Sequence, residues 1–223
     1  MKRAMNILII APHPDDEVLG CGGTIVKQVT TGDKVHLCIM TKGEEQYYGA
    51  QMLIEKRAEV LRVADFLGIT KVHFCDFIAA HLDTVPQNQI NQKLKEIMDD
   101  VKPEILFIPH QGDLHRDHQL TFHAAMIAAK FILSPYLHKI YSYEALSETE
   151  QSSQYFQQFI PTTYVDLTEH LQKKLDALAL YTTELRLYPH PRSVKAAEYK
   201  ARSRGAEVGI EAAEAFMLIR ERL

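Results

Sequence analysis

The sequence predicts an α/β fold with a mostly parallel, doubly wound sheet and helices on both of its faces. Two observations support this. Apolar runs of strand length alternate along the chain with segments whose apolar residues recur at helical spacing. The first of these runs is continuous, as expected for a parallel strand that is buried on both faces. The length of 223 residues suits one layered core, so we expect a single domain over residues 1–223.

The first half of the chain shows the alternation clearly. Residues 5–11 form an apolar run that ends at Pro12, which predicts a buried strand. After a loop, a helix should begin at Gly20 and end near Gly32. Apolar residues at three-and-four spacing predict another helix, with Gly68 as its C-cap. The predicted strands are 5–11, 34–40 and 71–75, and the predicted helices are 20–31, 51–67 and 88–101.

The second half continues the pattern. An apolar run at 104–109 predicts a strand, and the alanine-rich segment 119–133 predicts a helix. A further strand is expected at 138–143. Two more helices are expected at 167–186 and 193–220, separated by a segment with two prolines.

The composition argues against several classes of partner. The 25 basic and 29 acidic side chains give a net charge of −4, without the basic stripe of a nucleic-acid-binding protein. No apolar stretch approaches the roughly 20 residues that a membrane span requires, so we expect no membrane span. Cys21, Cys38 and Cys75 show no paired spacing, which is typical of buried thiols in a reducing compartment. We therefore expect a cytoplasmic protein, and the sequence leaves a homo-oligomer open.

The loop after the first predicted strand carries the strongest signal of chemistry. Four of the five positions from His13 to Glu17 are ionisable, and crowding them at a sheet edge is costly unless a positive charge neutralises them. A divalent cation would do so. His13 and Asp16 offer ligands that zinc accepts, and Asp15 can stay unligated and act as a base. Alternatively, the acids cap the helix that follows, and the loop alone leaves both interpretations open.

A second polar loop, at residues 110–118, follows the predicted strand at 104–109. It contains His115 and His118 with Asp117 between them. Such a group can supply one metal ligand and one imidazole outside the coordination shell, because a ligating or catalytic histidine usually needs a carboxylate to fix its tautomer. The alternative is a solvated polar loop. Because ligands bind beyond the carboxyl ends of parallel strands, we expect the two loops to face each other.

A ligand set of the His, Asp, His kind leaves an open coordination position, which is typical of a catalytic zinc. Two alternatives stand beside it. The same set resembles the facial triad of non-haem iron oxygenases, which is disfavoured because those sites commonly occur in β-barrels. A nucleotide-binding module without catalysis is suggested by Gly20-Cys-Gly-Gly23, but the GxGxxG pattern would need a glycine where Ile25 stands.

Together these motifs resemble those of the PIG-L and LmbE-like family of zinc-dependent N-acetylglucosaminyl de-N-acetylases. The resemblance spans most of the chain, and its most specific part is the HPDDE loop with the downstream HxDH motif. The matching segments are APHPDDEVLGCGGT at 11–24, TKGE at 41–44, RAE at 57–59, LG at 67–68, LHRDH at 114–118, RG at 204–205 and AEAF at 213–216. Pro12 departs from the family's usual Ala-His-Pro start, and we expect it to change only how the chain leaves the strand.

The resemblance implies a Rossmann-like fold and hydrolysis of the acetamide of a glucosamine-type sugar by metal-activated water. It also implies Zn²⁺ as the cofactor, with other divalent transition metals open. By motif position, the metal ligands would be His13, Asp16 and His118.

The resemblance further assigns roles to the residues around the metal. Asp15 would be the general base. His115 would stabilise the oxyanion or protonate the amine, and Asp117 would orient it. Arg57 matches a basic position near the substrate, which we expect to be a small-molecule or oligosaccharide N-acetyl amino sugar.

Overall fold

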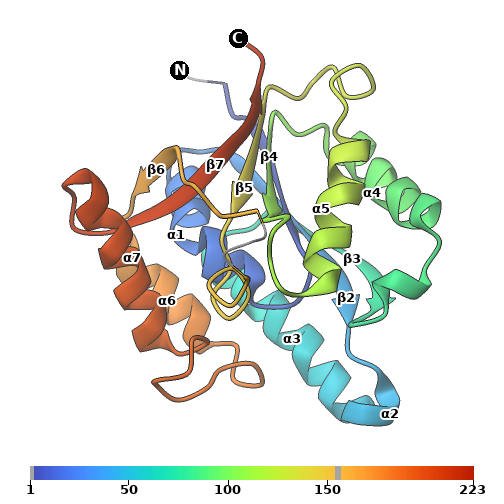
Figure 1. Cartoon of the computed structure of the whole chain (residues 1–223), viewed down its shortest axis with the longest axis horizontal. Coiled ribbons are helices and arrows are strands. Elements are labelled where there is room, and N and C mark those ends of the chain that lie inside the picture. Colours follow the sequence, from blue (N-terminus) through green and yellow to red (C-terminus); the bar gives the residue numbers. More distant parts are fainter. Residues whose placement is uncertain (1–2, 154–156) are drawn as a thin grey trace.

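A seven-stranded sheet in the order β3-β2-β1-β4-β5-β7-β6 forms the centre of the computed structural model, which describes residues 3–153 and 157–223. Neighbouring strands from β3 to β5 pair in parallel, whereas β7 pairs antiparallel with both β5 and β6. The strands are β1 (Asn6–Ala11), β2 (Lys34–Lys42), β3 (Lys71–Ile78), β4 (Ile105–Pro109), β5 (Lys139–Tyr143), β6 (Thr163–Asp166) and β7 (Ala213–Glu221). The predicted mostly parallel α/β sheet is confirmed (Figure 1).

Helices cover both faces of this sheet (Figure 1). One face carries α1 (Asp16–Thr30), α3 (Ala50–Leu67), α6 (Leu171–Ala179) and α7 (Val194–Val208), and the other carries α4 (Gln87–Val101) and α5 (Arg116–Ala128). The short helices α2 (Glu45–Tyr48) and η1 (Leu82–Thr84) lie in loops. The continuous apolar run of β1 serves both layers, because Ile7 and Ile9 pack in one core cluster and Leu8 and Ile10 in the other.

The strand order reverses between β1 and β4, which are hydrogen-bonded neighbours. In a doubly wound sheet this switch point leaves a crevice outside the carboxyl ends of the two strands. The polar loops that follow β1 and β4 therefore meet at one edge of the sheet, as the sequence predicted.

Two helices begin earlier than the sequence predicted. Helix α1 begins at Asp16 instead of Gly20, and α5 begins at Arg116 instead of Gln119. The prediction was wrong because both polar loops continue directly into a helical turn, where acidic side chains interact favourably with the helix N-terminus. Helix α5 also ends at Ala128, short of the predicted end at 133.

The secondary structure predicted for the C-terminal segment was wrong, because part of the expected helix is a strand. The expected helix at 193–220 is α7, which ends at Val208, followed by strand β7. Gly209 adopts a left-handed conformation with φ 76° and ends the helix, a C-cap signal that the alanine-rich sequence obscured. Strand β6 was not predicted, and the helix expected at 167–186 is the shorter α6.

A buried ion pair fixes α1 to the C-terminal part of the chain. Lys174 and Glu214 are 3% and 4% exposed, with 2.7 Å between Nζ and Oε1. The Glu214 carboxylate accepts hydrogen bonds from the backbone N–H groups of Gly23 and Thr24, and Lys174 Nζ donates to the carbonyl of Leu19. The AEAF segment therefore holds the helix that begins with Asp16.

The glycines of α1 allow this close packing. A Cβ on Gly20 would lie 2.3 Å from the Tyr143 ring, and one on Gly23 would lie 2.5 Å from Leu167. Both lie inside the helix and not in a loop that could wrap a phosphate. The glycine run thus serves helix packing, which disfavours the nucleotide-binding alternative.

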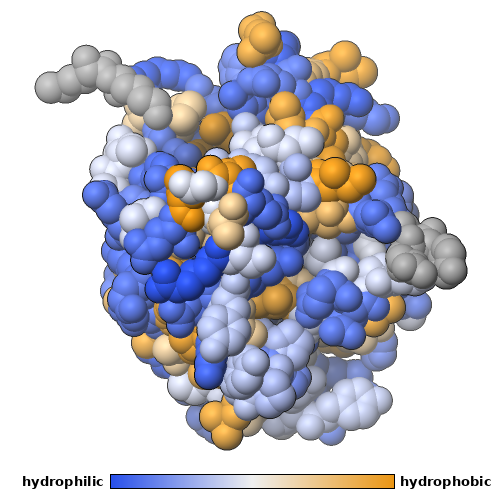
Figure 2. Space-filling view, turned by 60° about the vertical axis from the view of Figure 1, so that its left-hand side comes forward, coloured by the Kyte–Doolittle hydropathy of each residue, from blue (hydrophilic) through white to orange (hydrophobic). Residues whose placement is uncertain are grey.

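The surface over α6 and α7 is mostly hydrophilic, and its hydrophobic side chains form small separate groups (Figure 2). Within residues 3–153 and 157–223, none of the helices has the length and apolar character needed to cross a membrane.

Candidate active site

The first wall of the site is the turn between β1 and α1. His13 leaves the strand, and its backbone N–H donates a 2.9 Å hydrogen bond to Asp16 Oδ2. Asp15, at the N-cap of α1, has a left-handed backbone with φ 94°, which is uncommon for a residue other than glycine. This turn buries Asp15 and Asp16, which are 3% and 4% exposed.

The second wall is the loop between β4 and α5. His115 caps α5, and its Nδ1 accepts a 3.1 Å hydrogen bond from the backbone N–H of Asp117. His118, in the first turn of α5, is fully buried. The two walls meet at Asp16, because His118 Nε2 lies 3.2 Å from Asp16 Oδ2.

His13, Asp16 and His118 each offer one ligand atom, and these atoms lie within 4.8 Å of one another. Two nitrogens and one carboxylate oxygen form a donor set that zinc accepts, with a coordination position left open. His118 Nε2 is buried and lies 3.2 Å from Asp16 Oδ2 of the same group, but it makes no hydrogen bond of acceptable geometry with any described residue. A buried nitrogen of this kind is costly unless something binds it, so the group fits a metal ion.

A second group of potential ligands shares His13 and adds His115 and Asp117. The Asp117 carboxylate is already engaged. It accepts hydrogen bonds from the backbone N–H groups of Ala80 and Leu82, and Oδ2 lies 3.0 Å from His13 Nε2. The first group is therefore the better candidate, because His118 Nε2 has no hydrogen bond to a described residue outside this group.

Asp113 is a site residue that the sequence prediction missed. Its Oδ2 lies 2.8 Å from His118 Nδ1, and its Oδ1 accepts a hydrogen bond from Thr149. A carboxylate in this position holds the imidazole with Nε2 facing the metal position. Asp113 lies within the polar loop at 110–118, and an acidic residue near two histidines is itself a sign of a metal site. The sequence does not show, however, that the backbone brings this residue to His118.

Burial and neighbouring charges shift the pKa values of the site. Burial and then the charge of Asp16 raise the pKa of Asp15 well above its usual range, although Arg192 acts in the opposite direction. Burial lowers the pKa of His118, but Asp16 and Asp113 outweigh it and raise that pKa to about 10. Burial and the nearby His13 lower the pKa of His115 to about 4, so this imidazole is neutral at neutral pH.

The hydrogen bonds of His115 fix its tautomer. Because Nδ1 accepts the N–H of Asp117, the proton of the neutral ring lies on Nε2, which becomes a donor. The Asp117 carboxylate is 3.9 Å from His115 Nδ1 and only 3.0 Å from His13 Nε2. Asp117 thus orients His115 through its backbone and contacts His13 with its side chain.

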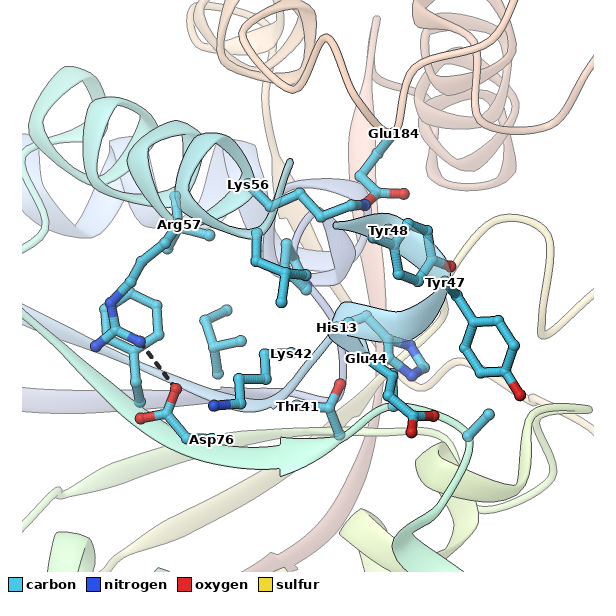
Figure 3. Close-up of a pocket in the computed structure, with 18 of the residues that line it drawn as sticks. His13, Thr41, Lys42, Glu44, Tyr47, Tyr48, Lys56, Arg57, Asp76 and Glu184 are labelled. Atoms are coloured by element: carbon cyan, nitrogen blue, oxygen red, sulfur yellow. Dashed lines mark hydrogen bonds and ion pairs between the residues drawn. The ribbon is translucent and has the colours of Figure 1, made fainter. Parts of the chain in front are cut away.

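A pocket of about 500 Å³ opens at His13 and His115 and reaches Arg57. Arg57 Nη1 is 2.9 Å from Asp76 Oδ1, and the guanidinium stacks on Phe74 with 3.7 Å between its Cζ and the ring centroid. Figure 3 shows this ion pair at one end of the pocket and His13 toward the other. All seven residues singled out in the sequence therefore lie in or beside one cavity, and their individual roles stay predictions.

Arg192 also lines this pocket. It comes from the proline-containing segment that follows α6. Its Nη1 is 3.4 Å from Glu184 Oε2, and its Nε donates to Ser147. A segment distant in the sequence thus contributes to the wall of the pocket.

Comparison with known proteins gives a consistent set of relatives. The family model described as PIG-L, GlcNAc-PI de-N-acetylase, matches residues 8–129, more than half of the chain. The diacetylchitobiose deacetylase of Thermococcus kodakarensis is 24% identical over 190 residues, which cover 80% of this chain and 70% of the relative.

Two solved structures share the fold. N,N'-diacetylchitobiose deacetylase from Pyrococcus horikoshii matches with a TM-score of 0.78 at 23% identity, covering 97% of this chain and 84% of that chain. The 4-carboxy-2-hydroxymuconate hydratase from Pseudomonas putida KT2440 matches with a TM-score of 0.76 at 20% identity, covering 100% and 98%. These likenesses show the fold alone, and since one fold can carry a deacetylase and a hydratase, the reaction must be inferred from the site.

Proposed function

Because the chain belongs to the PIG-L family of GlcNAc-PI de-N-acetylases, we propose that it is a metal-dependent hydrolase that releases acetate from an N-acetylated amino sugar of the N-acetylglucosamine type. The observation that carries this proposal is the convergence of His13, Asp16 and His118 beside a pocket. The relative from Thermococcus kodakarensis, a diacetylchitobiose deacetylase, supports the substrate class.

We propose Zn²⁺ as the metal, because the nitrogen and oxygen donors suit it and no thiolate is among them. His118 would bind through Nε2 while Asp113 holds Nδ1. A divalent ion held there would supply Lewis acidity, polarising the acetamide carbonyl and making water a stronger nucleophile at neutral pH.

Asp15 is the proposed general base. It lies in the chain between His13 and Asp16 and is buried, and its raised pKa makes it a stronger proton acceptor near neutral pH than an exposed carboxylate. It would take a proton from the attacking water. The same carboxyl group can then return that proton to the leaving amine.

His115 is the proposed oxyanion donor. The neutral ring carries its proton on Nε2, and the residue lines the pocket beside His13. Its lowered pKa favours this role over the alternative that the sequence left open, protonation of the amine by an imidazolium. A preorganised donor of this kind stabilises charge that develops only in the transition state.

Replacing His115 with alanine should therefore lower kcat by about 100-fold or more while KM and metal content stay nearly unchanged. Steady-state kinetics and metal analysis on the same preparation would test this. His123→Ala, an exposed histidine on the same helix, is the matched control and should behave as wild type. Loss of the metal from His115→Ala would show that His115 is a ligand.

The proposed function is tested by measuring acetate released from N-acetylglucosamine and its glycosides, in air and without oxygen. We expect equal rates under both conditions, because hydrolysis consumes only water. Acetate release that requires oxygen would favour the iron oxygenase alternative, and no release from any N-acetyl sugar would refute a de-N-acetylase. The cytoplasmic location and the oligomeric state stay predictions.

A further inference from the structure

Away from His13, the pocket continues into a recess lined by apolar side chains. We call this the apolar recess and define it by Ile39, Leu53, Val60 and Phe74. Ile39 and Val60 are 1% and 0% exposed, so they lie at the bottom of the recess. Ile54, which also lines the pocket, is 62% exposed and marks its mouth.

Two of the cations beside the apolar recess, both on α3, are already paired. Arg57 forms its ion pair with Asp76 and stacks on Phe74. Lys56 forms an ion pair with Glu184, which comes from the segment after α6. Figure 3 shows both pairs at the border of the pocket, with Lys56 and Arg57 extending from α3. The charges of these two side chains are therefore neutralised, which leaves Lys42 as the one lining cation without an ion pair to a described residue.

A polar group buried against such a surface would lose its hydrogen bonds to water and gain few in return. A second sugar ring carries several hydroxyl groups, and a carboxylate carries a charge, so both would bind there at a cost. An apolar group would gain from leaving water. In N-acetylglucosamine the acetamide is on the carbon next to the anomeric carbon, so a group on the anomeric oxygen lies near the reacting amide.

We propose that the apolar recess binds an aryl or alkyl aglycone, and that the preferred substrates are N-acetyl amino sugars that carry such a group. This inference rests on the proposed de-N-acetylase function and names the substrate class for the same site. Leu53 and Ile54 are then specificity-determining residues that contact the aglycone and not the reacting atoms.

The test compares acetate release from four glycosides of N-acetylglucosamine that differ only in the aglycone: methyl, phenyl, carboxymethyl and a second N-acetylglucosamine. We expect kcat/KM for the phenyl glycoside to exceed that for the methyl glycoside by about 10-fold or more, since single methylene groups in apolar pockets discriminate by 10-fold or more. The carboxymethyl glycoside and the disaccharide should show no such gain.

Substitutions in the apolar recess test whether this part of the pocket causes the preference for the phenyl glycoside. Leu53→Ser and Ile54→Ser should each bring the phenyl-to-methyl ratio of kcat/KM toward one, and Ile54 is exposed enough that its substitution leaves folding intact. Leu61→Ser is the matched control, because Leu61 lies on the same helix, is 51% exposed and lies outside the pocket lining. It should keep the wild-type ratio.

A wild-type ratio near one, or a ratio that both variants leave unchanged, would overturn the inference. So would a preference for the carboxymethyl glycoside, which would point to an anion bound near Lys42, or for the disaccharide. In all of these cases acetate release from the methyl glycoside would still support the proposed function. Absence of acetate from every glycoside would refute the proposed function and this inference with it.

Discussion

Replacing Asp15 with asparagine should leave the metal bound and lower kcat by about 100- to 10,000-fold. Asparagine has nearly the same shape but cannot accept the proton of the attacking water. Asp15 also lies outside the group formed by His13, Asp16 and His118, so its loss should not remove a ligand. Metal analysis and kinetics on the purified variant would measure both effects.

The neighbouring substitution Asp16→Asn is the contrasting variant. Asp16 Oδ2 lies 3.2 Å from His118 Nε2 and accepts the backbone N–H of His13, so it lies between the other two proposed ligands. We expect this variant to lose the metal and, for that reason, its activity. If both variants keep the metal, or both lose it, the division of roles between the two aspartates is wrong.

Replacing Lys174 with methionine should lower the free energy of unfolding by about 3–5 kcal/mol, the usual cost of leaving a buried charge without its partner. The Glu214 carboxylate would keep its two backbone donors but lose its cation. For a protein of this size, the loss corresponds to a fall in Tm of about 6–20 °C. Denaturant unfolding gives the free energy, and a thermal scan gives Tm.

Lys173→Met is the matched control for this substitution. Lys173 precedes Lys174 on α6 but is exposed, so the same chemical change there should alter the free energy of unfolding by about 0.5 kcal/mol or less. Equal stability of the two variants would mean that the buried pair contributes nothing beyond a surface lysine.

The part of the fold that could be predicted depends on local patterns. The apolar run of β1 is continuous because its side chains enter two cores, and Gly68 ends α3 in the left-handed conformation that only a glycine adopts easily. Strand β7 could not be predicted in the same way. Its alanine-rich start is compatible with a helix, and only pairing with β5 and β6 makes it a strand.

The residues of the candidate site likewise differ in how well the sequence predicts them. His13, Asp16 and His118 follow directly from two motifs at the ends of adjacent strands. Asp113 and Arg192 do not, because their place depends on how a loop and a distant proline-containing segment pack against the motifs. The apolar recess joins residues from β2, α3 and β3, so its character was visible only in three dimensions.

The most direct test is to remove the metal with a chelator and add zinc back while acetate release from an N-acetylglucosamine glycoside is measured. We expect no activity in the stripped protein and full recovery at one zinc per chain. His118→Ala, treated identically, should recover neither tight zinc binding nor activity, since His118 supplies a buried nitrogen that makes no hydrogen bond within the described part of the chain. Acetate release by the metal-free protein, or full recovery in His118→Ala, would contradict a catalytic metal held by His13, Asp16 and His118.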